Sequence, residues 1–483
     1  MNDQVKTVCY RNVDWLVRWN AKAGAHEYLR GGDFAYEGDR IVHAGHSFAG
    51  ACAEERDGAG LMIMPGLINL HTHSATMPVL KGIREDMANP RLYMSALYDG
   101  WNLFPTPPER KRWNTAYAYG EMLRSGVTTV LDMCYPFPGW VDIAEESGLR
   151  CFLGGLFQSA QWSTTNGHSL EYIWAEDGGE AAMAGALAVI EEARGRGSDL
   201  LDGAVTPMAV DTCTAELIRD AEQESQRLGA PFQLHVGESM IEFLEMSRRT
   251  GMSQMQWLEA NGLLLEGMLI GHGIFLDHHS WLHWGTRNDL DLLVDINAAV
   301  THCPVVFSRY GITLETFGLY NDAGVTMTIG TDVFPHNMIE EMRAAAVCGR
   351  IADQHMHAVP TTSVFEAATS EAAKALGRDD LGRLAPGAKA DFVVVDTQVP
   401  EMQPLYDPLR SLIHTAADRA VRDVFVGGTA RVRDGVVLSI AMPRAAAEVN
   451  ATQEALMPNA SSRHWAQKPL DEIAPRTLPL AEQ

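Results

Sequence analysis

This chain has few cysteines, no long apolar run and no charged leader, and each absence excludes a class of protein. Its seven cysteines are scattered and contain no CxxC pair, which argues against a disulfide framework or a zinc-finger site. Reduced thiols of this kind are typical of a cytoplasmic protein. No segment approaches ~18 consecutive apolar residues, and the N-terminus lacks a basic region followed by an apolar stretch. We therefore expect neither a membrane span nor a secretory signal.

Positive charge is scarce as well. The 38 lysines and arginines are outnumbered by 62 acidic residues, which gives a formal net charge of −24. Such a surface repels phosphate backbones and anionic headgroups, so nucleic acid and membranes are not expected partners. The remaining composition, 46% hydrophobic and 21% charged residues, is typical of a soluble globular enzyme.

Short apolar, β-rich runs recur along the middle of the chain, and each is followed by helix-like sequence. Several begin with a glycine, as the end of a preceding helix requires. Eight strand–helix repeats predict an α/β protein, a (β/α)8 TIM barrel spanning residues 61–381. The predicted strands lie in residues 61–73, 126–133, 148–157, 203–211, 231–238, 267–276, 298–304 and 325–332. After them, Ser363 and Glu366 have the spacing of a capping box, which predicts a helix that begins at Ser363.

The two ends of the chain differ from this middle part. Residues 1–60 and 382–439 hold short strand candidates separated by turn signals, and each segment is too small for a core of its own. We expect the two segments to pair into one small β-sandwich domain beside the barrel. Residues 440–483 are expected to form a helical and irregular C-terminal tail.

Polar residues stand where several predicted strands end. His71 and His73 close the apolar run LMIMPGLINLHTH, and their i, i+2 spacing puts both rings on one face of a strand. His235 lies in LHVGES, His272 in MLIGHG, and Asp332 ends TIGTD.

The carboxyl ends of barrel strands share one rim, so these groups are expected to lie close together. Three imidazoles, those of His71, His73 and His235, together with the carboxylate of Asp332 suit one divalent metal ion. With a position left open for water, this donor set predicts catalytic Zn²⁺, with Fe²⁺ as the alternative.

These motifs, with the later segments PGAKADFVVVD and VFVGG, resemble the amidohydrolase superfamily in its cytosine-deaminase and chlorohydrolase-like branch. The resemblance implies a mononuclear metal site held by His71, His73, His235 and Asp332. It also implies that Glu238 shuttles protons, that His272 stands beside the water or substrate, and that the protein forms a homodimer or a higher homo-oligomer. The fourth predicted strand has no lysine to bridge two metals, which favours one ion.

The expected catalytic residues are Glu238, His272 and Asp332. A bound metal lowers the pKa of water toward ~7, which supplies hydroxide at neutral pH. A carboxylate beside that water takes up its proton and delivers it to the leaving group. Asp332 orients the attacking oxygen, and His272 stabilises developing charge.

The residues expected to contact a small-molecule substrate match the sequence pattern of the amidohydrolase superfamily less closely than the expected metal ligands do. In TPMAVDTCTAEL, Met208 stands where relatives often place a substrate-contacting histidine, and Asp211 replaces an aromatic residue. Arg309, His336 and Trp101 are the other candidates. An apolar methionine at this rim suggests a more hydrophobic substrate or a differently oriented leaving group.

Together these features predict a hydrolase acting on carbon–nitrogen bonds other than peptide bonds, in which metal-bound hydroxide attacks an sp² carbon. The leading interpretation is deamination of an aromatic N-heterocycle. Hydrolysis of an amide, urea or carbamate bond of an aromatic compound is the second, and hydrolytic dechlorination the third. A non-catalytic binding protein of the same fold is the alternative from another class.

Overall fold

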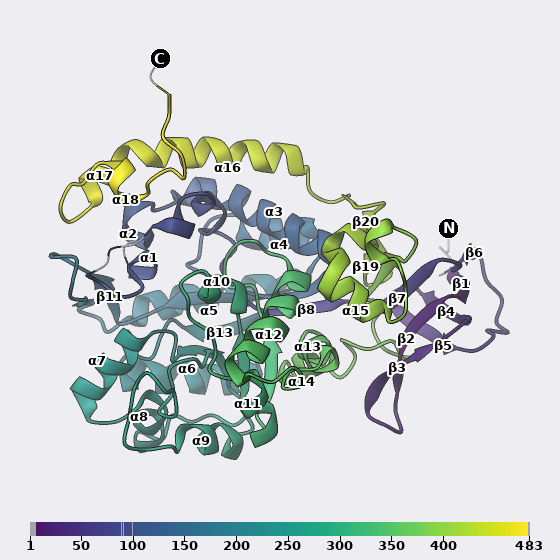
Figure 1. Cartoon of the computed structure of the whole chain (residues 1–483), viewed down its shortest axis with the longest axis horizontal. Helices are drawn as coiled ribbons and strands as arrows, with labels where there is room; N and C mark the ends of the chain where they lie inside the picture. Colours follow the sequence, from purple (N-terminus) through teal and green to yellow (C-terminus); the bar gives the residue numbers. More distant parts are fainter. Residues whose placement is uncertain (1–5, 88, 90, 99, 482–483) are drawn as a thin grey trace.

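The computed structural model describes residues 6–87, 89, 91–98 and 100–481, with the side chains of Asp86 and Trp101 excepted. The protein has a mixed α/β fold in which a parallel strand assembly is flanked at one end by two sheets that are mostly antiparallel (Figure 1). No helix of the described residues is long and apolar enough to cross a membrane.

Eight parallel strands occupy the centre of the molecule, in two four-stranded sheets. Isolated parallel bridges, Val205↔Phe232 and Thr72↔Asp332, link the two sheets at both sides. Each strand therefore has a parallel neighbour on either side, and we call this assembly the strand ring. Its members in order are β8 (Leu67–Thr72), β9 (Val127–Cys134), β10 (Arg150–Phe157), β13 (Leu201–Pro207), β14 (Gln233–Val236), β15 (Leu269–His272), β16 (Ala299–His302) and β17 (Thr326–Ile329).

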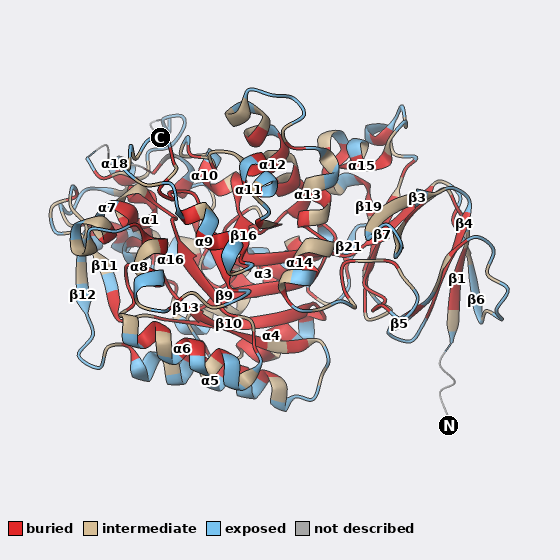
Figure 2. Cartoon of the chain, turned by 90° about the horizontal axis from the view of Figure 1, so that it is seen from below, coloured by how far each residue is buried: buried red, intermediate tan, exposed pale blue. Residues whose placement is uncertain are grey.

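Helices cover the outside of the strand ring and bury one face each, as α5 and α6 show (Figure 2). In α6, Thr214 caps the first turn by accepting from the Leu217 amide, and Gly229 ends the helix with a left-handed φ of 58°. Leu217, Ile218 and Ala221 form its buried stripe at helical spacing. The covering helices are α3 (Pro108–Arg124), α4 (Trp140–Ser147), α5 (Glu180–Gly195), α6 (Ala215–Leu228), α7 (Met240–Thr250), α8 (Gln254–Ala260), α9 (Asp289–Asp295), α10 (Pro304–Ser308), α11 (Phe317–Ala323), α12 (Met338–Asp353), α13 (Thr361–Ala367) and α14 (Ser370–Ala375).

The expected strand over residues 61–73 is two strands, β7 (Leu61–Pro65) and β8. β7 pairs with β18 (Phe392–Asp396) and β2 (Trp15–Asn20), outside the strand ring. Gly66 joins β7 to β8, and a Cβ at this position would lie 2.1 Å from the Thr128 hydroxyl oxygen. One apolar run therefore serves two sheets, because the glycine lets the chain cross closely over its neighbour.

The capping-box prediction at Ser363 is wrong. The helix α13 begins at Thr361, after Pro360, and no side chain caps it. Pro360 stands at the N-cap position with an extended ψ of 153°, so the helix begins directly after it and two residues before the serine.

Two sheets at the end of the molecule combine the chain's N-terminal and C-terminal segments. Their shared core is aromatic: Phe34 and Tyr10 from one sheet meet Phe392 from the other, and Phe392 stacks on Phe425 with ring centres 4.3 Å apart. The four-stranded sheet has the order β5-β4-β1-β6 and the seven-stranded sheet β21-β20-β19-β18-β7-β2-β3. Bounds are β1 (Thr7–Val13), β3 (Ala25–Leu29), β4 (Gly32–Glu37), β5 (Arg40–Gly45), β6 (Glu54–Asp57), β19 (Val421–Val426), β20 (Thr429–Arg433) and β21 (Val436–Val437).

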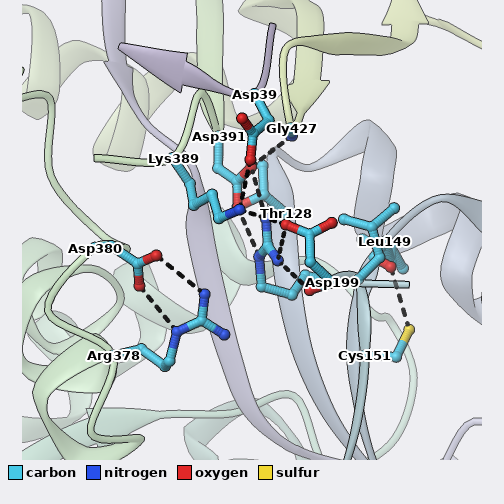
Figure 3. Close-up of polar contacts among 12 residues, drawn as sticks. Asp39, Thr128, Leu149, Cys151, Asp199, Arg378, Asp380, Lys389, Asp391 and Gly427 are labelled. Carbon is cyan, nitrogen blue, oxygen red and sulfur yellow. Dashed lines mark hydrogen bonds and ion pairs between the residues drawn. The ribbon is translucent and has the colours of Figure 1, made fainter. Parts of the chain in front are cut away.

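An ionic network with a buried centre and two exposed carboxylates, Asp39 and Asp199, fastens these terminal sheets to the strand ring (Figure 3). Arg150, at the start of β10, is 1% exposed, and its Nε lies 3.0 Å from Oδ2 of Asp391, just before β18. The Lys389 ammonium binds Asp199 and, at 2.5 Å, Asp39. Charges from four separate segments thus neutralise one another at the junction.

The C-terminal segment packs along the strand ring as well. Helix α16 (Met442–Leu456) lies beside α3 (Figure 1). Arg110 and Glu448 form an ion pair of 3.0 Å between the two helices, and the Gln453 amide donates to the carbonyls of Val79 and Lys81. Short elements complete the chain: β11 (Ala160–Ser163), β12 (Glu171–Trp174), α1 (Ser95–Tyr98), α2 (Gly100–Leu103), α15 (Pro408–Ser411), α17 (Ala460–Arg463) and α18 (Leu470–Ile473).

Candidate metal centre and active site

Three imidazoles and a carboxylate meet at the carboxyl ends of the strand ring. His71 and His73 come from the end of β8, His235 from β14, and Asp332 from the turn after β17. Asp332 Oδ1 lies 3.4 Å from His73 Nε2 and 3.8 Å from His71 Nε2. His235 Nε2 lies 3.3 Å from His73 Nε2, and all four residues are buried. The structure therefore brings together the four metal ligands predicted from the sequence.

Backbone carbonyls at the ends of neighbouring strands fix the tautomers of two of these rings. His73 Nδ1 lies 2.6 Å from the Met133 carbonyl oxygen, and His235 Nδ1 contacts that of Met208. A carbonyl only accepts, so each Nδ1 carries the proton and each Nε2 presents a lone pair. Two lone pairs 3.3 Å apart repel each other unless a cation lies between them.

Gln233 fixes the tautomer of the third ring, that of His71. Its Nε2 donates to the Leu70 carbonyl at 3.0 Å, which turns its Oε1 toward His71 Nδ1, also at 3.0 Å. His71 Nε2 is left buried without a hydrogen-bond partner. Gln233 was not among the residues predicted from the sequence, although it stands two residues before His235 and so on the same face of β14.

The donor set fits a divalent metal such as Zn²⁺ or Fe²⁺. Burial lowers the pKa of His71 well below its ordinary range and that of His235 to about 3. Both rings are therefore neutral at physiological pH, which is the form that binds metals. Metal-binding imidazoles need their other ring nitrogen to donate a hydrogen bond, and here Nδ1 donates to two backbone carbonyls and one amide oxygen.

Backbone geometry places the fourth donor. Asp332 has a left-handed φ of 54°, and its amide donates to the His71 carbonyl at 2.8 Å. At Gly330, a Cβ would lie 2.6 Å from the His71 Cβ. The glycine thus lets β17 approach β8 closely, and the turn that follows aims the Asp332 carboxylate at the imidazoles.

Glu238 and His272 stand next to this cluster. Glu238 Oε1 lies 3.9 Å from His272 Nε2, and both residues are buried. Burial, with the negative charges of Asp332 and Glu242, raises the pKa of Glu238 well above its ordinary range. Burial and the neighbouring imidazoles lower the pKa of His272. Glu238 is thus suited to hold a proton, and His272 is neutral.

Glu242 positions the loop that carries Glu238. Its carboxylate accepts from the amides of Gly237 at 2.7 Å and Glu238 at 2.9 Å. Ser239 caps α7 by accepting from the Glu242 amide. Glu242 was not among the residues predicted from the sequence, although its spacing of three from Ser239 is that of a capping box.

A cavity of about 20 Å³, room for roughly one water molecule, opens among these groups. Its lining is polar on the side of the histidine cluster and mostly apolar elsewhere, with Arg84 and Tyr310 as the exceptions. A substrate therefore enters only when the covering side chains move apart. The lining residues are His73, Met77, Arg84, Met94, Leu97, Met208, His235, Glu238, Val306, Phe307, Tyr310, Asp332 and Val333.

Of the residues expected to contact substrate, Met208 lines the cavity and three others have different contacts. The Asp211 carboxylate accepts from Trp162 at 2.9 Å and Tyr172 at 2.7 Å, and so anchors the β11–β12 hairpin. Arg309 donates to the Phe334 carbonyl at 2.5 Å.

His336 contacts Glu121 of α3, with Nδ1 3.3 Å from Oε2. It is buried outside the cavity lining and precedes the α12 cap, Asn337. The side chain of Trp101, the fifth expected substrate contact, lies outside the described residues.

The sequence resembles archaeal deaminases over most of its length. It is 29% identical over 390 residues to 5-methylthioadenosine/S-adenosylhomocysteine deaminase of Natronomonas pharaonis, covering 80% of this chain and 84% of that protein. It is 27% identical over 419 residues to 5'-deoxyadenosine deaminase of Methanothermobacter thermautotrophicus, covering 84% of this chain and 90% of that protein.

Solved structures agree in fold. A zinc-bound adenosine deaminase from Xanthomonas campestris superposes with a TM-score of 0.78 at 22% identity, covering 93% of this chain and 98% of that chain. A triazine hydrolase from Arthrobacter aurescens superposes with a TM-score of 0.78 at 21% sequence identity, covering 93% of this chain and 99% of that chain. The sequence pattern of the Amidohydrolase family matches residues 62–431, which include every residue of the cluster, and the chain therefore belongs to that family.

Proposed function

We propose that this protein, a hydrolase of carbon–nitrogen bonds, deaminates a small aromatic N-heterocycle with the help of one divalent metal ion. Zn²⁺ is the preferred candidate for this ion, and Fe²⁺ is the alternative. One observation carries the proposal: three imidazole lone pairs and the Asp332 carboxylate converge beside the carboxyl group of Glu238. Deaminases among the relatives support the reaction type.

His71, His73 and His235 would hold the metal through Nε2 and Asp332 through Oδ1. When bound, a divalent cation supplies Lewis acidity, which lowers the pKa of water from about 15.7 toward ~7. The carbonyls of Met133 and Met208 and the Gln233 amide keep each ring oriented throughout.

Glu238 moves the proton. Its carboxylate accepts one proton from the attacking water and donates it to the exocyclic nitrogen, which leaves as ammonia as the new carbon–oxygen bond replaces the carbon–nitrogen bond. The raised pKa of Glu238 suits both steps, because the group must bind and release a proton near neutral pH. His272 Nε2, 3.9 Å from Glu238 Oε1, is placed to hydrogen-bond the same reacting atoms.

The test is release of ammonia from a panel of aminopyrimidines, aminopurines and aminotriazines by Zn²⁺-loaded protein. Glu238→Gln should bind one equivalent of metal and lose at least ~10²-fold in turnover. Glu192→Gln, an exposed glutamate on α5, is the matched control and should match wild type. Chelator-treated wild type should be inactive until metal is restored. Unchanged turnover in Glu238→Gln would remove this mechanism.

A second reaction, hydrolysis of an aryl amide or urea, is favoured by the apolar part of the cavity, where Met94, Leu97 and Met208 would pack against a hydrophobic leaving group. Assaying the same variants for released aryl amine instead of ammonia separates the two reactions.

We also propose an architecture for the whole chain. The strand ring is a closed (β/α)8 barrel of residues 61–381, and residues 1–60 with 382–439 form a β-sandwich to which β7 adds a strand. Residues 440–483 form a docked tail, and the protein works as a homodimer.

A further inference from the structure

Arg84 is a buried cation that has no anionic partner among the side chains described by the structure. It lies in the short turn Arg84–Asp86 after β8 and is 4% exposed. Its Nη1 donates to the Met77 thioether at 3.3 Å, which is a weak acceptor, and its Nε is buried without a partner. Among side chains that the structure describes, no carboxylate forms an ion pair with it.

The guanidinium stands at the candidate active site. Arg84 lines the cavity that also contains Glu238 and Asp332. It lines a second small cavity on its other side, with Leu80 and Phe104. Burial raises the pKa of both acidic groups, and the positive charge of Arg84 opposes that rise. The side chain therefore lies between the metal centre and the segment that covers it.

Neither of these carboxylates is free to neutralise Arg84. Asp332 belongs to the candidate ligand set, and Glu238 must exchange its proton in each turnover. An uncompensated charge in a buried site is costly, and such groups are normally paired. A guanidinium presents a planar fork of donors that matches a carboxylate through two parallel hydrogen bonds.

We infer that Arg84 binds a carboxylate on the substrate. This inference rests on the proposed function and narrows its substrate class to an aromatic or heteroaromatic amine with an acidic substituent. Met94, Leu97 and Phe307 supply the apolar wall for the ring. The reacting carbon faces the histidine cluster while the carboxylate faces Arg84, so one ion pair sets the orientation of the substrate.

Calorimetric titration with benzoate and benzamide tests the inference without turnover, because the two probes match in size and differ in charge. Wild type should bind benzoate more tightly by about 10- to 100-fold. Arg84→Gln should lose this preference. Arg91→Gln, an exposed arginine of the same segment, should keep it. Metal content and circular dichroism verify that each variant is folded.

Direct binding of benzoate to the metal is distinguished by the same titrations. A preference that persists in Arg84→Gln, or that disappears when wild type is depleted of metal, overturns the inference. If Arg84→Gln does not fold, titrations of metal-depleted wild type and of Arg84→Lys test whether Arg84 binds benzoate. Arg84→Lys keeps the positive charge and should retain part of the preference for benzoate. Ammonia release without a benzoate preference overturns this inference alone, whereas a benzoate preference without any turnover overturns the proposed reaction alone.

Discussion

At the scale of single residues, the candidate metal site consists of side chains at the ends of strands and of the residues that orient them. His71, His73, His235 and Asp332 could be chosen because each ends an apolar run, and strand ends share a rim. Gln233 carries no such signal of its own. Its role follows from a hydrogen bond across to β8, a contact between residues far apart in the sequence.

Replacing Gln233 with leucine should weaken metal binding. The His71 Nδ1–H then loses its acceptor, so the ring is free to rotate and to shift its proton onto Nε2. Loss of such an outer hydrogen bond typically costs about 10- to 100-fold in affinity. Competition with a coloured chelator measures it, and Gln161→Leu, at an exposed position, is the control. Equal chelator competition by both variants would contradict the role given to Gln233.

At the scale of elements, the sequence locates all eight strands of the ring but not every boundary. The run over residues 61–73 is uniformly apolar, and nothing in its pattern shows that Gly66 passes a neighbouring strand closely. The helix near Ser363 begins earlier than predicted because Pro360 starts it, and the spacing of polar residues is coincidental there. Boundaries depend on contacts that periodicity does not contain.

The junction between β14 and α7 supports a prediction at this scale. Glu242→Ala removes the acceptor for the Gly237 and Glu238 amides, so the loop should loosen and misplace the Glu238 carboxyl. Displacement of about 1 Å can cost ~10²-fold in rate. We expect kcat to fall with little change in KM or metal content, and Glu242→Gln, which keeps one acceptor, to recover part of the rate. A loss confined to KM would argue against positioning.

At the scale of the whole molecule, the strand ring and the terminal sheets are joined by the network around Arg150 and Asp391. The sequence predicted that both ends of the chain combine, because neither could form a core alone. It did not predict this junction, since arginine and aspartate are common surface residues and their burial arises only when the two parts pack.

Arg150→Met should destabilise the protein by about 3–5 kcal/mol, because it leaves the Asp391 carboxylate buried without its partner. Arg196→Met, which breaks exposed ion pairs with Asp142, Glu145 and Glu192, should cost much less, because solvent screens those charges. Denaturant-induced unfolding followed by circular dichroism gives both values. Comparable losses in the two variants would mean that the junction contributes no more than a surface contact.

The pairing of β7 with both β2 and β18 has a consequence for biosynthesis. A ribosome releases β2 and β7 early, whereas β18 leaves the exit tunnel only after the entire ring has been translated. Until then one edge of β7 is exposed on the nascent polypeptide, so this early-made strand is among the last to complete its pairing, and chaperones have a long time to act on it.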